Sequence, residues 1–154
     1  MAIQQDLTAL TQEGVFDQLS EAVAGVLSGA KLHLFKSGFT PTFNSVAADF
    51  AAQECDFTGY AASTLTWSAP GLDSTGQPIT ISDRAFFQAT DALAPNTVGG
   101  AWLQADVTGP PASHTALGYW VFNPTVPMTQ ALSSLGVVVG WQLPGNTGYA
   151  LADY

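Results

Sequence analysis

Two histidines, one cysteine and a short run of carboxylates are the side chains of this 154-residue chain with the chemistry for catalysis or metal binding. His33 lies in the segment KLHLF, where alternation predicts a half-buried strand with His33 on the face opposite Leu32 and Leu34. His114 follows the turn TGPPAS. Either ring could serve as a general base or a metal ligand. A zinc site built on histidines usually takes them at close spacing, as in HxxxH or HxH. His33 and His114 are 81 positions apart, so we expect an ordinary strand residue and a loop residue.

The other reactive groups also have simple structural interpretations. Cys55 lies between Glu54 and Asp56, and adjacent carboxylates raise a thiol pKa, whereas a nucleophile needs a lowered one. Asp49, Glu54 and Asp56 form an acidic cluster suited to acid–base chemistry or calcium binding, but the DxDxDG pattern of a calcium loop is missing. We expect a buried structural cysteine and solvated helix-cap carboxylates, with Asp73 as a turn residue at a hairpin tip.

Motifs for cofactors and covalent catalysis are missing from the chain. It contains no GxGxxG or GxxxxGK[ST] phosphate loop and no GxSxG elbow. Four tryptophans, at 67, 102, 120 and 141, fall in apolar segments, where we expect core packing, with one or two lining a sugar-stacking groove as the alternative. The sequence therefore predicts no catalytic, cofactor-binding or metal residues, and a protein that is not an enzyme.

Composition excludes further classes. Lys31, Lys36 and Arg84 are the only basic residues against twelve acidic ones, a net charge of −9, so neither nucleic acid nor an anionic membrane surface is an expected partner. Charged residues make up only 10% of the chain, against about 25% in typical globular domains. Either Ser, Thr, Asn, Gln and Ala cover the surface, or other subunits do. No apolar run is long enough to span a bilayer, and we expect no signal peptide.

Apolar spacing in the first thirty residues predicts one amphipathic helix over about residues 15–28. It follows a polar arm, residues 1–14, in which we take Leu7 and Leu10 as the apolar anchors. Such an arm is either disordered or packed on a neighbouring subunit.

After Gly29 the sequence changes to short β-like runs separated by Gly, Pro and Asn, with predicted turns that include PGLDSTGQP and NPTVP. The predicted strands cover 31–36, 60–68, 78–89, 98–106, 115–122 and 135–143, with a short helix near 44–54. This pattern predicts a mainly β fold, an antiparallel β-sandwich or partly open, jelly-roll-like barrel, in one domain over 15–143. Residues 144–154 are predicted to be a last strand or a tail that docks on another chain.

The block over 15–65 resembles a family of small proteins encoded beside virion genes in tailed-phage genomes. The likeness consists of an N-terminal helix, an LxLF strand, an FTP turn and an acidic helix ending in FTGYA. The matching residues are Leu32, Leu34, Phe35, Phe39, Thr40, Pro41, Asp49, Phe57, Thr58, Gly59, Tyr60 and Ala61. A looser match in LGYWVFNPTVPM and LGVVVGW extends the likeness to about residues 15–143, while the low charge and the extra run AAQEC depart from it.

The resemblance implies a non-enzymatic virion protein, made in the host cytoplasm, that decorates or cements the capsid. Its implied partners are the major capsid protein or another virion protein and further copies of itself, a trimer being one candidate. The alternative is a tail-fibre or adhesion module that binds host carbohydrate through the strand tryptophans. From the residues themselves we expect a contact surface made by apolar side chains of the arm, the FTPTF turn and the C-terminus: Leu7, Leu10, Phe39, Pro41, Phe43, Tyr149 and Tyr154. For the three turn residues, a hydrophobic cluster closing the bottom of the sandwich is the competing interpretation.

Overall fold

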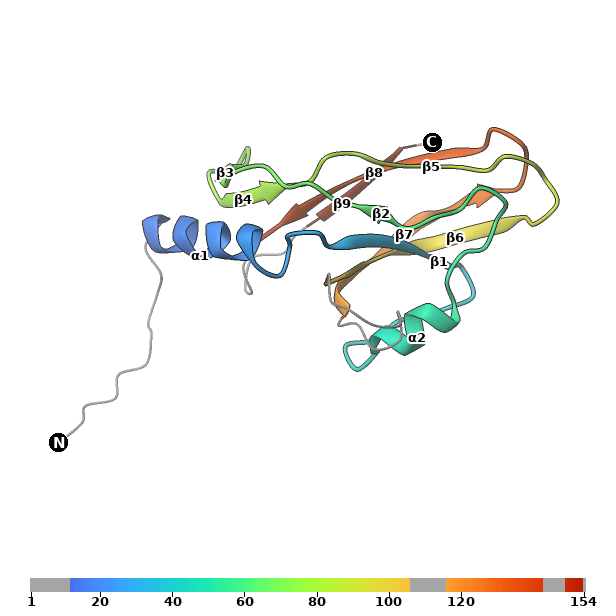
Figure 1. Cartoon of the computed structure of the whole chain (residues 1–154), viewed down its shortest axis with the longest axis horizontal. Coiled ribbons are helices and arrows are strands. Elements are labelled where there is room, and N and C mark those ends of the chain that lie inside the picture. Colours follow the sequence, from blue (N-terminus) through green and yellow to red (C-terminus); the bar gives the residue numbers. More distant parts are fainter. Residues whose placement is uncertain (1–11, 106–115, 143–148, 154) are drawn as a thin grey trace.

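The computed structural model describes residues 12–105, 116–142 and 149–153. Two antiparallel sheets pack face to face, and two short helices, α1 (Gln12–Ala24) and α2 (Ala47–Ala52), lie outside them (Figure 1). The predicted mainly β fold is confirmed, and of the two predicted architectures the sandwich is the one observed. Among the described helices none has the length and apolar character needed to cross a bilayer.

The first sheet has the strand order β2-β1-β6-β7. Its strands are β2 (Ser63–Thr64), β1 (Lys31–Lys36), β6 (Asn96–Gln104) and β7 (Ala116–Met128). Cross-strand neighbours share a face, so the row Leu34–Ala101 points into the sandwich, and the next row, His33–Trp102, points away from it. The last strand, β7, contains two prolines, which lack the N–H donor and are tolerated on edge strands.

The second sheet is built around β8 (Ser134–Trp141). The other strands are β3 (Gly71–Leu72), β4 (Pro78–Ile81), β5 (Ala85–Gln88) and β9 (Tyr149–Asp153). Both β4 and β5 pair with one edge of β8, and β9 pairs with the other edge. The single strand predicted over 78–89 is therefore interrupted at residues 82–84, although both of its halves pair with β8.

Several element boundaries differ from the predictions. The first helix ends at Ala24 instead of residue 28, because the chain passes into turns ending at Gly29, whose φ of 71° favours glycine. Only Ser63–Thr64 of the predicted strand 60–68 forms a strand, with one further bridge between Trp67 and Ser82. The strand predicted over 115–122 continues to Met128, because an edge strand accepts prolines.

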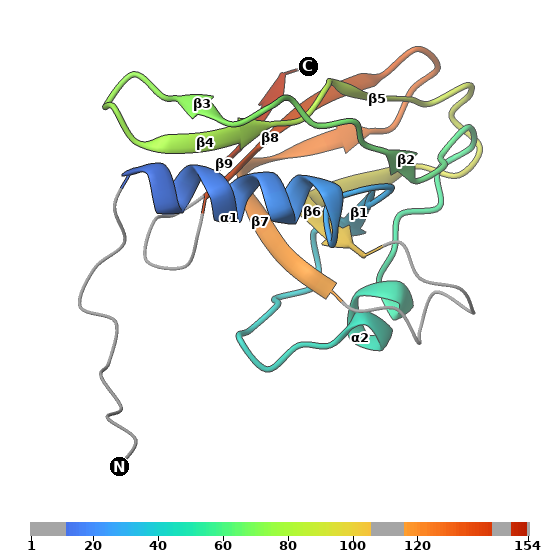
Figure 2. The same ribbon diagram turned by 60° about the vertical axis from the view of Figure 1, so that its left-hand side comes forward.

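The protein has two hydrophobic cores. The larger core fills the space between the sheets, and α1 contributes to it (Figure 2). The smaller core lies on the outer face of the first sheet, where α2 places Phe50 over Phe35 and Trp102. β1 is therefore buried on both faces, whereas alternation in its sequence predicted a half-buried strand.

Candidate functional site

The segment that follows α2 covers the free edge of β1. The amide N–H of Cys55 donates to the carbonyl of Leu34 at 2.9 Å, and that of Lys36 donates to the carbonyl of Gln53 at 2.9 Å. The Leu34 N–H donates to the hydroxyl of Tyr60 at 3.0 Å. Because β2 pairs only with the first two residues of β1, this segment supplies the hydrogen bonds that the edge would otherwise lack.

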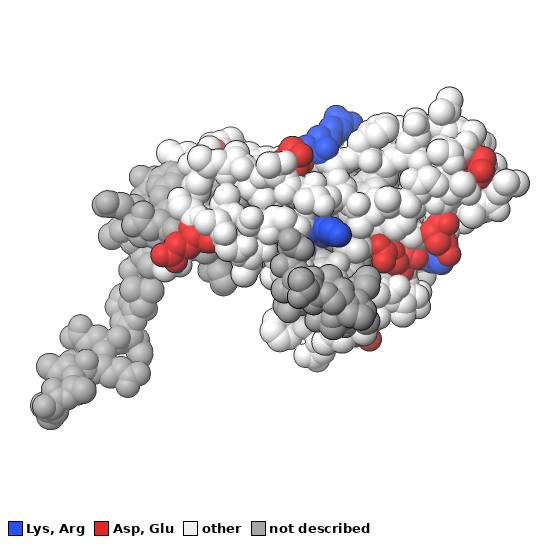
Figure 3. Space-filling view, in the orientation of Figure 1, with Lys and Arg blue, Asp and Glu red and all other residues white. Residues whose placement is uncertain are grey.

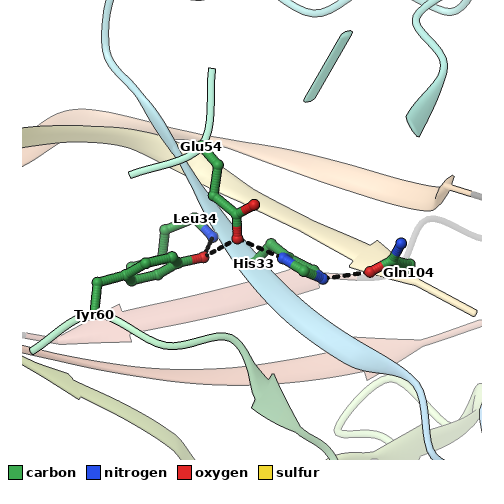
Figure 4. A network of polar contacts seen from close by, with 5 residues as sticks. All are labelled: His33, Leu34, Glu54, Tyr60 and Gln104. Atoms are coloured by element: carbon green, nitrogen blue, oxygen red, sulfur yellow. Dashed lines mark hydrogen bonds and ion pairs between the residues drawn. The ribbon is translucent and has the colours of Figure 1, made fainter. Parts of the chain in front are cut away.

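A buried network of polar side chains lies on this segment (Figure 4). One carboxylate oxygen of Glu54 accepts hydrogen bonds from Nδ1 of His33 and from the Tyr60 hydroxyl, both at 2.6 Å. The other ring nitrogen of His33 lies 2.5 Å from the side-chain oxygen of Gln104. The predicted face of His33 is confirmed, but the expectation that Glu54 is a solvated cap residue was wrong, because its side chain is only 24% exposed.

The network alters the acidity of two of its members. Burial raises the pKa of Glu54, but the hydrogen bonds from His33 and Tyr60 outweigh burial, and the pKa lies below its ordinary value. Burial, followed by the hydrogen bond to Glu54, raises the pKa of Tyr60, which keeps the phenol protonated. Glu54 is thus an anion held by two donors.

Histidine, carboxylate and phenol are the groups of an acid–base site, but each is already engaged here. Both ring nitrogens of His33 have side-chain partners, and the Tyr60 hydroxyl donates to Glu54 while accepting from Leu34. The contacts join β1, β6 and the segment after α2. The arrangement therefore holds the polypeptide together, and we call it the polar clasp (His33, Glu54, Tyr60 and Gln104).

A shallow hollow of about 660 Å³ lies beside the polar clasp. Lys36 and Asp56 line it and form an ion pair at 3.1 Å, with 39% and 69% of their side chains exposed. Exposed pairs of this kind contribute little to stability. Cys55 also lines the hollow, and burial raises the pKa of its thiol to about 12, in agreement with the expected structural cysteine. No three His, Cys, Asp or Glu side chains gather as a metal-ligand set in the described ranges.

The tryptophans do not form an exposed sugar-stacking platform. Trp102 is fully buried between the rings of His33, at 4.5 Å, and Phe50, at 5.1 Å. The other three are partly buried against the larger core. The alternative of a groove lined by Trp102 was therefore wrong, because α2 covers the outer face on which this residue lies.

The three turn residues predicted as a contact surface separate into two groups. Phe39 packs edge-on against Phe35 and Phe50 and so belongs to the smaller core, which lies on the outer face of the first sheet and not at the bottom of the sandwich. Pro41 is buried. Phe43 is 97% exposed. Tyr149 begins β9, and its side chain lies outside the described part. Leu7, Leu10 and Tyr154 lie outside the described residues, as does His114.

Phe43 belongs to an apolar surface that the sequence analysis missed. With Phe50 and Tyr119 it lines a pocket of about 340 Å³, whose other lining residues are Thr42, Ser45, Ala116, Leu117 and Gly118. The rings of Phe50 and Tyr119 are 5.7 Å apart. Tyr119 is 37% exposed, and its neighbour Val121, on the same outer face of β7, is 63% exposed. We call this the aromatic pocket; no charged residue lines it among the described residues.

A second apolar surface is formed by two loops at one end of the sandwich, residues 89–95 and 129–133 (Figure 1). Leu93 is 87% exposed and Leu132 is 73% exposed. The Leu132 N–H donates to the carbonyl of Ala89 at 2.8 Å, which joins the loops. Leu132 has a φ of 68°, a left-handed conformation that costs a leucine about 1–2 kcal/mol. We call these two leucines and their loops the leucine tip.

Charged residues make up only 10% of the chain. Figure 3 shows one face on which acidic and basic groups are few and scattered.

Comparison of the chain with protein-family models, with curated proteins and with solved structures gives no significant match. The resemblance to phage virion proteins therefore stays a prediction.

Proposed function

We propose that this chain is a non-enzymatic structural protein of a tailed-phage virion that decorates or cements the capsid. It binds the assembled head shell as a homo-oligomer, with the major capsid protein or another virion protein as its partner. The resemblance in residues 15–65 supports this proposal, as does a surface that carries little charge and two separate apolar features.

The proposal depends on one observation, the backbone conformation and exposure of Leu132. A loop position with positive φ normally takes Gly or Asn, whose backbones tolerate it. Here the position carries a leucine that is 73% exposed, so neither local conformation nor burial in this chain explains the side chain. Strain retained at an exposed position points to a functional contact. We assign the leucine tip to the capsid shell.

Weak contacts suffice for such a protein. A multimer that meets a repeating lattice makes several contacts at once, so modest affinity per copy becomes tight binding overall. A pair of exposed leucines per copy fits this mode better than a deep pocket. The polar clasp then serves to keep each copy rigid.

The proposal is tested with head shells of the encoding phage from which this protein has been removed. We expect the purified full chain to bind them to saturation at a fixed number of copies per shell. Leu132→Asn relieves the backbone strain and removes the apolar side chain, so the variant should be at least as stable as the parent yet bind shells at least about tenfold more weakly.

The matched control is Leu72→Ser, which removes an exposed leucine from the β3–β4 hairpin (55% exposed). It should leave shell binding unchanged. A parent protein that is strictly monomeric and does not bind any shell would overturn the proposed function. Binding that is lost equally in both variants would overturn the assignment of the leucine tip.

A further inference from the structure

We propose that the aromatic pocket receives the N-terminal arm, residues 1–11, of a second copy of this chain. This inference rests on the proposed function, because it names the contact that makes the homo-oligomer. It also assigns a role to the exposed Phe43, which the polar clasp and the leucine tip do not use.

The pocket has the character of a site for an apolar segment. Three aromatic rings line it, and Phe43 is 97% exposed while Phe50 is almost fully buried beneath it. Covering an exposed Phe side chain removes apolar surface from water, which favours association. Thr42 and Ser45 place hydroxyl groups at the rim, where an extended backbone needs hydrogen-bond partners.

The strand beside the pocket supports the same kind of occupant. β7 is the last strand of the first sheet, and in the described part of the chain its only strand partner is β6. An edge strand can accept an extended segment as an additional strand. Pro124 and Pro127 deprive the C-terminal half of β7 of two N–H donors. The half with its donors intact begins at Ala116 and includes the pocket residues.

The arm matches this site in length, composition and charge. It contains eleven residues before α1 and spans up to about 36 Å when extended. Its sizeable aliphatic side chains are Ile3, Leu7 and Leu10, and Asp6 is its only charged side chain. Two bodies with a net charge near −9 repel each other. None of the described residues that line the pocket is charged, so an arm with one carboxylate brings the two bodies together at little electrostatic cost.

The position of α1 favours a neighbour's pocket over the chain's own. In both views the start of α1 lies at the end of that helix farther from α2, the element that carries Phe50 (Figures 1 and 2). In a contact of this kind each copy gives one arm and receives one, so the oligomer closes either as a dimer that exchanges arms or, head-to-tail, as a ring when the rotation allows.

Mixing two full-length variants tests the proposal. Leu7→Ser combined with Leu10→Ser removes the apolar anchors of the arm but leaves the pocket intact, and Phe43→Ser does the reverse. Each variant alone should associate at least about tenfold more weakly than the parent, as measured by sedimentation velocity. An equimolar mixture should form a dimer, because one partner still supplies the arm and the other the pocket.

Two controls make the result specific. Gln5→Ser alters the arm without removing an apolar anchor, and Leu93→Ser removes an exposed leucine outside the pocket; both should associate like the parent. A mixture that stays monomeric, or variants that still assemble fully, would overturn the inference while shell binding by the parent left the proposed function standing. An arm that packs on its own body, or a glycan that fills the pocket, would give the same failure to complement.

Discussion

The carboxylate of Glu54 accepts one hydrogen bond from His33, which lies in β1, and one from Tyr60, which lies in the segment that covers the edge of β1. A carboxylate in this position cannot lose its charge without weakening both hydrogen bonds. The pKa of Glu54 is lowered for the same reason, because the two hydrogen bonds stabilise the charged form. The role of Glu54 is therefore structural and dependent on pH.

We expect Glu54→Gln to lower the free energy of unfolding by about 1–3 kcal/mol at pH 7, because a charged acceptor is replaced by a neutral one in a mostly buried site. The folded-state pKa is depressed, so the stabilisation is present above the ordinary pKa of Glu, about 4.3, and is lost as the pH falls through the folded value. Urea unfolding of both proteins between about pH 7 and 3 should show the gap closing in acid.

Asp56→Asn is the matched control, since this neighbouring carboxylate is exposed and paired with Lys36. Its effect on the unfolding free energy should stay within about 1 kcal/mol. A gap between Glu54→Gln and the parent that does not narrow as the pH falls below about 4.3 would contradict the assigned role of the carboxylate charge.

His33 shows what the sequence can and cannot predict about a single residue. The period of two in KLHLF was enough to place the ring on the face opposite Leu32 and Leu34. Its partners Glu54 and Gln104 are 21 and 71 residues away, and local periodicity carries no information about which distant segment covers a face. For the same reason the sequence did not predict that Trp102 is covered by α2.

Among the elements, β6 is the strand on which both cores depend. It pairs with β1 on one side and β7 on the other, and it supplies Trp102 to the smaller core and Leu103 to the larger one. Gly100 in this strand leaves room for the ring of Phe35, which lies across it. Close packing of this kind has no space for a methyl group.

Gly100→Ala should lower the free energy of unfolding by about 3 kcal/mol, because the new Cβ would collide with the Trp120 carbonyl and the Phe35 ring. Gly118→Ala, in the neighbouring strand, is the control: the nearest atom to its Cβ belongs to Trp141, at an ordinary 3.5 Å. That variant should match the parent or gain about 0.5 kcal/mol. If the two variants unfolded at the same temperature, the smaller core would be able to accommodate the added methyl group, and the prediction would be wrong.

Strands with strong local signals were predicted well, and those set by tertiary context were not. The strand at 31–36 was predicted with the observed boundaries. The sequence NPTVP was predicted to be a turn, yet it belongs to β7, because the edge position of that strand removes the penalty for proline. The two-residue strand β3 lies in a segment predicted to be a turn, and only its pairing with β4 defines it.

The whole molecule combines a net charge of −9 with apolar surfaces on two separate features. Repulsion between copies acts over distances comparable to the Debye length, about 10 Å at 0.1 M salt. In the proposed oligomer, burial of the arm and of Phe43 is insensitive to screening. That assembly would set a hydrophobic contact against a diffuse electrostatic penalty.

Raising the concentration of NaCl from about 0.02 to 0.5 M should strengthen self-association, because salt screens the repulsion and leaves the apolar contact intact. Sedimentation equilibrium across this range measures the effect, and glycerol at matched viscosity serves as the control. Association that weakens with salt would mean that ion pairs hold the copies together, against the uncharged lining of the aromatic pocket.

The burial of Cys55 has a practical consequence. It is the only cysteine of the chain, and at neutral pH its thiol stays protonated and shielded. Maleimide dyes react with thiolates at accessible positions, so the native protein offers them no competing target. Ser74→Cys, at an exposed position outside the leucine tip, would accept a single fluorophore with Cys55 left in place. As a further check of the proposed function, single-particle imaging could then count labelled copies on one head shell.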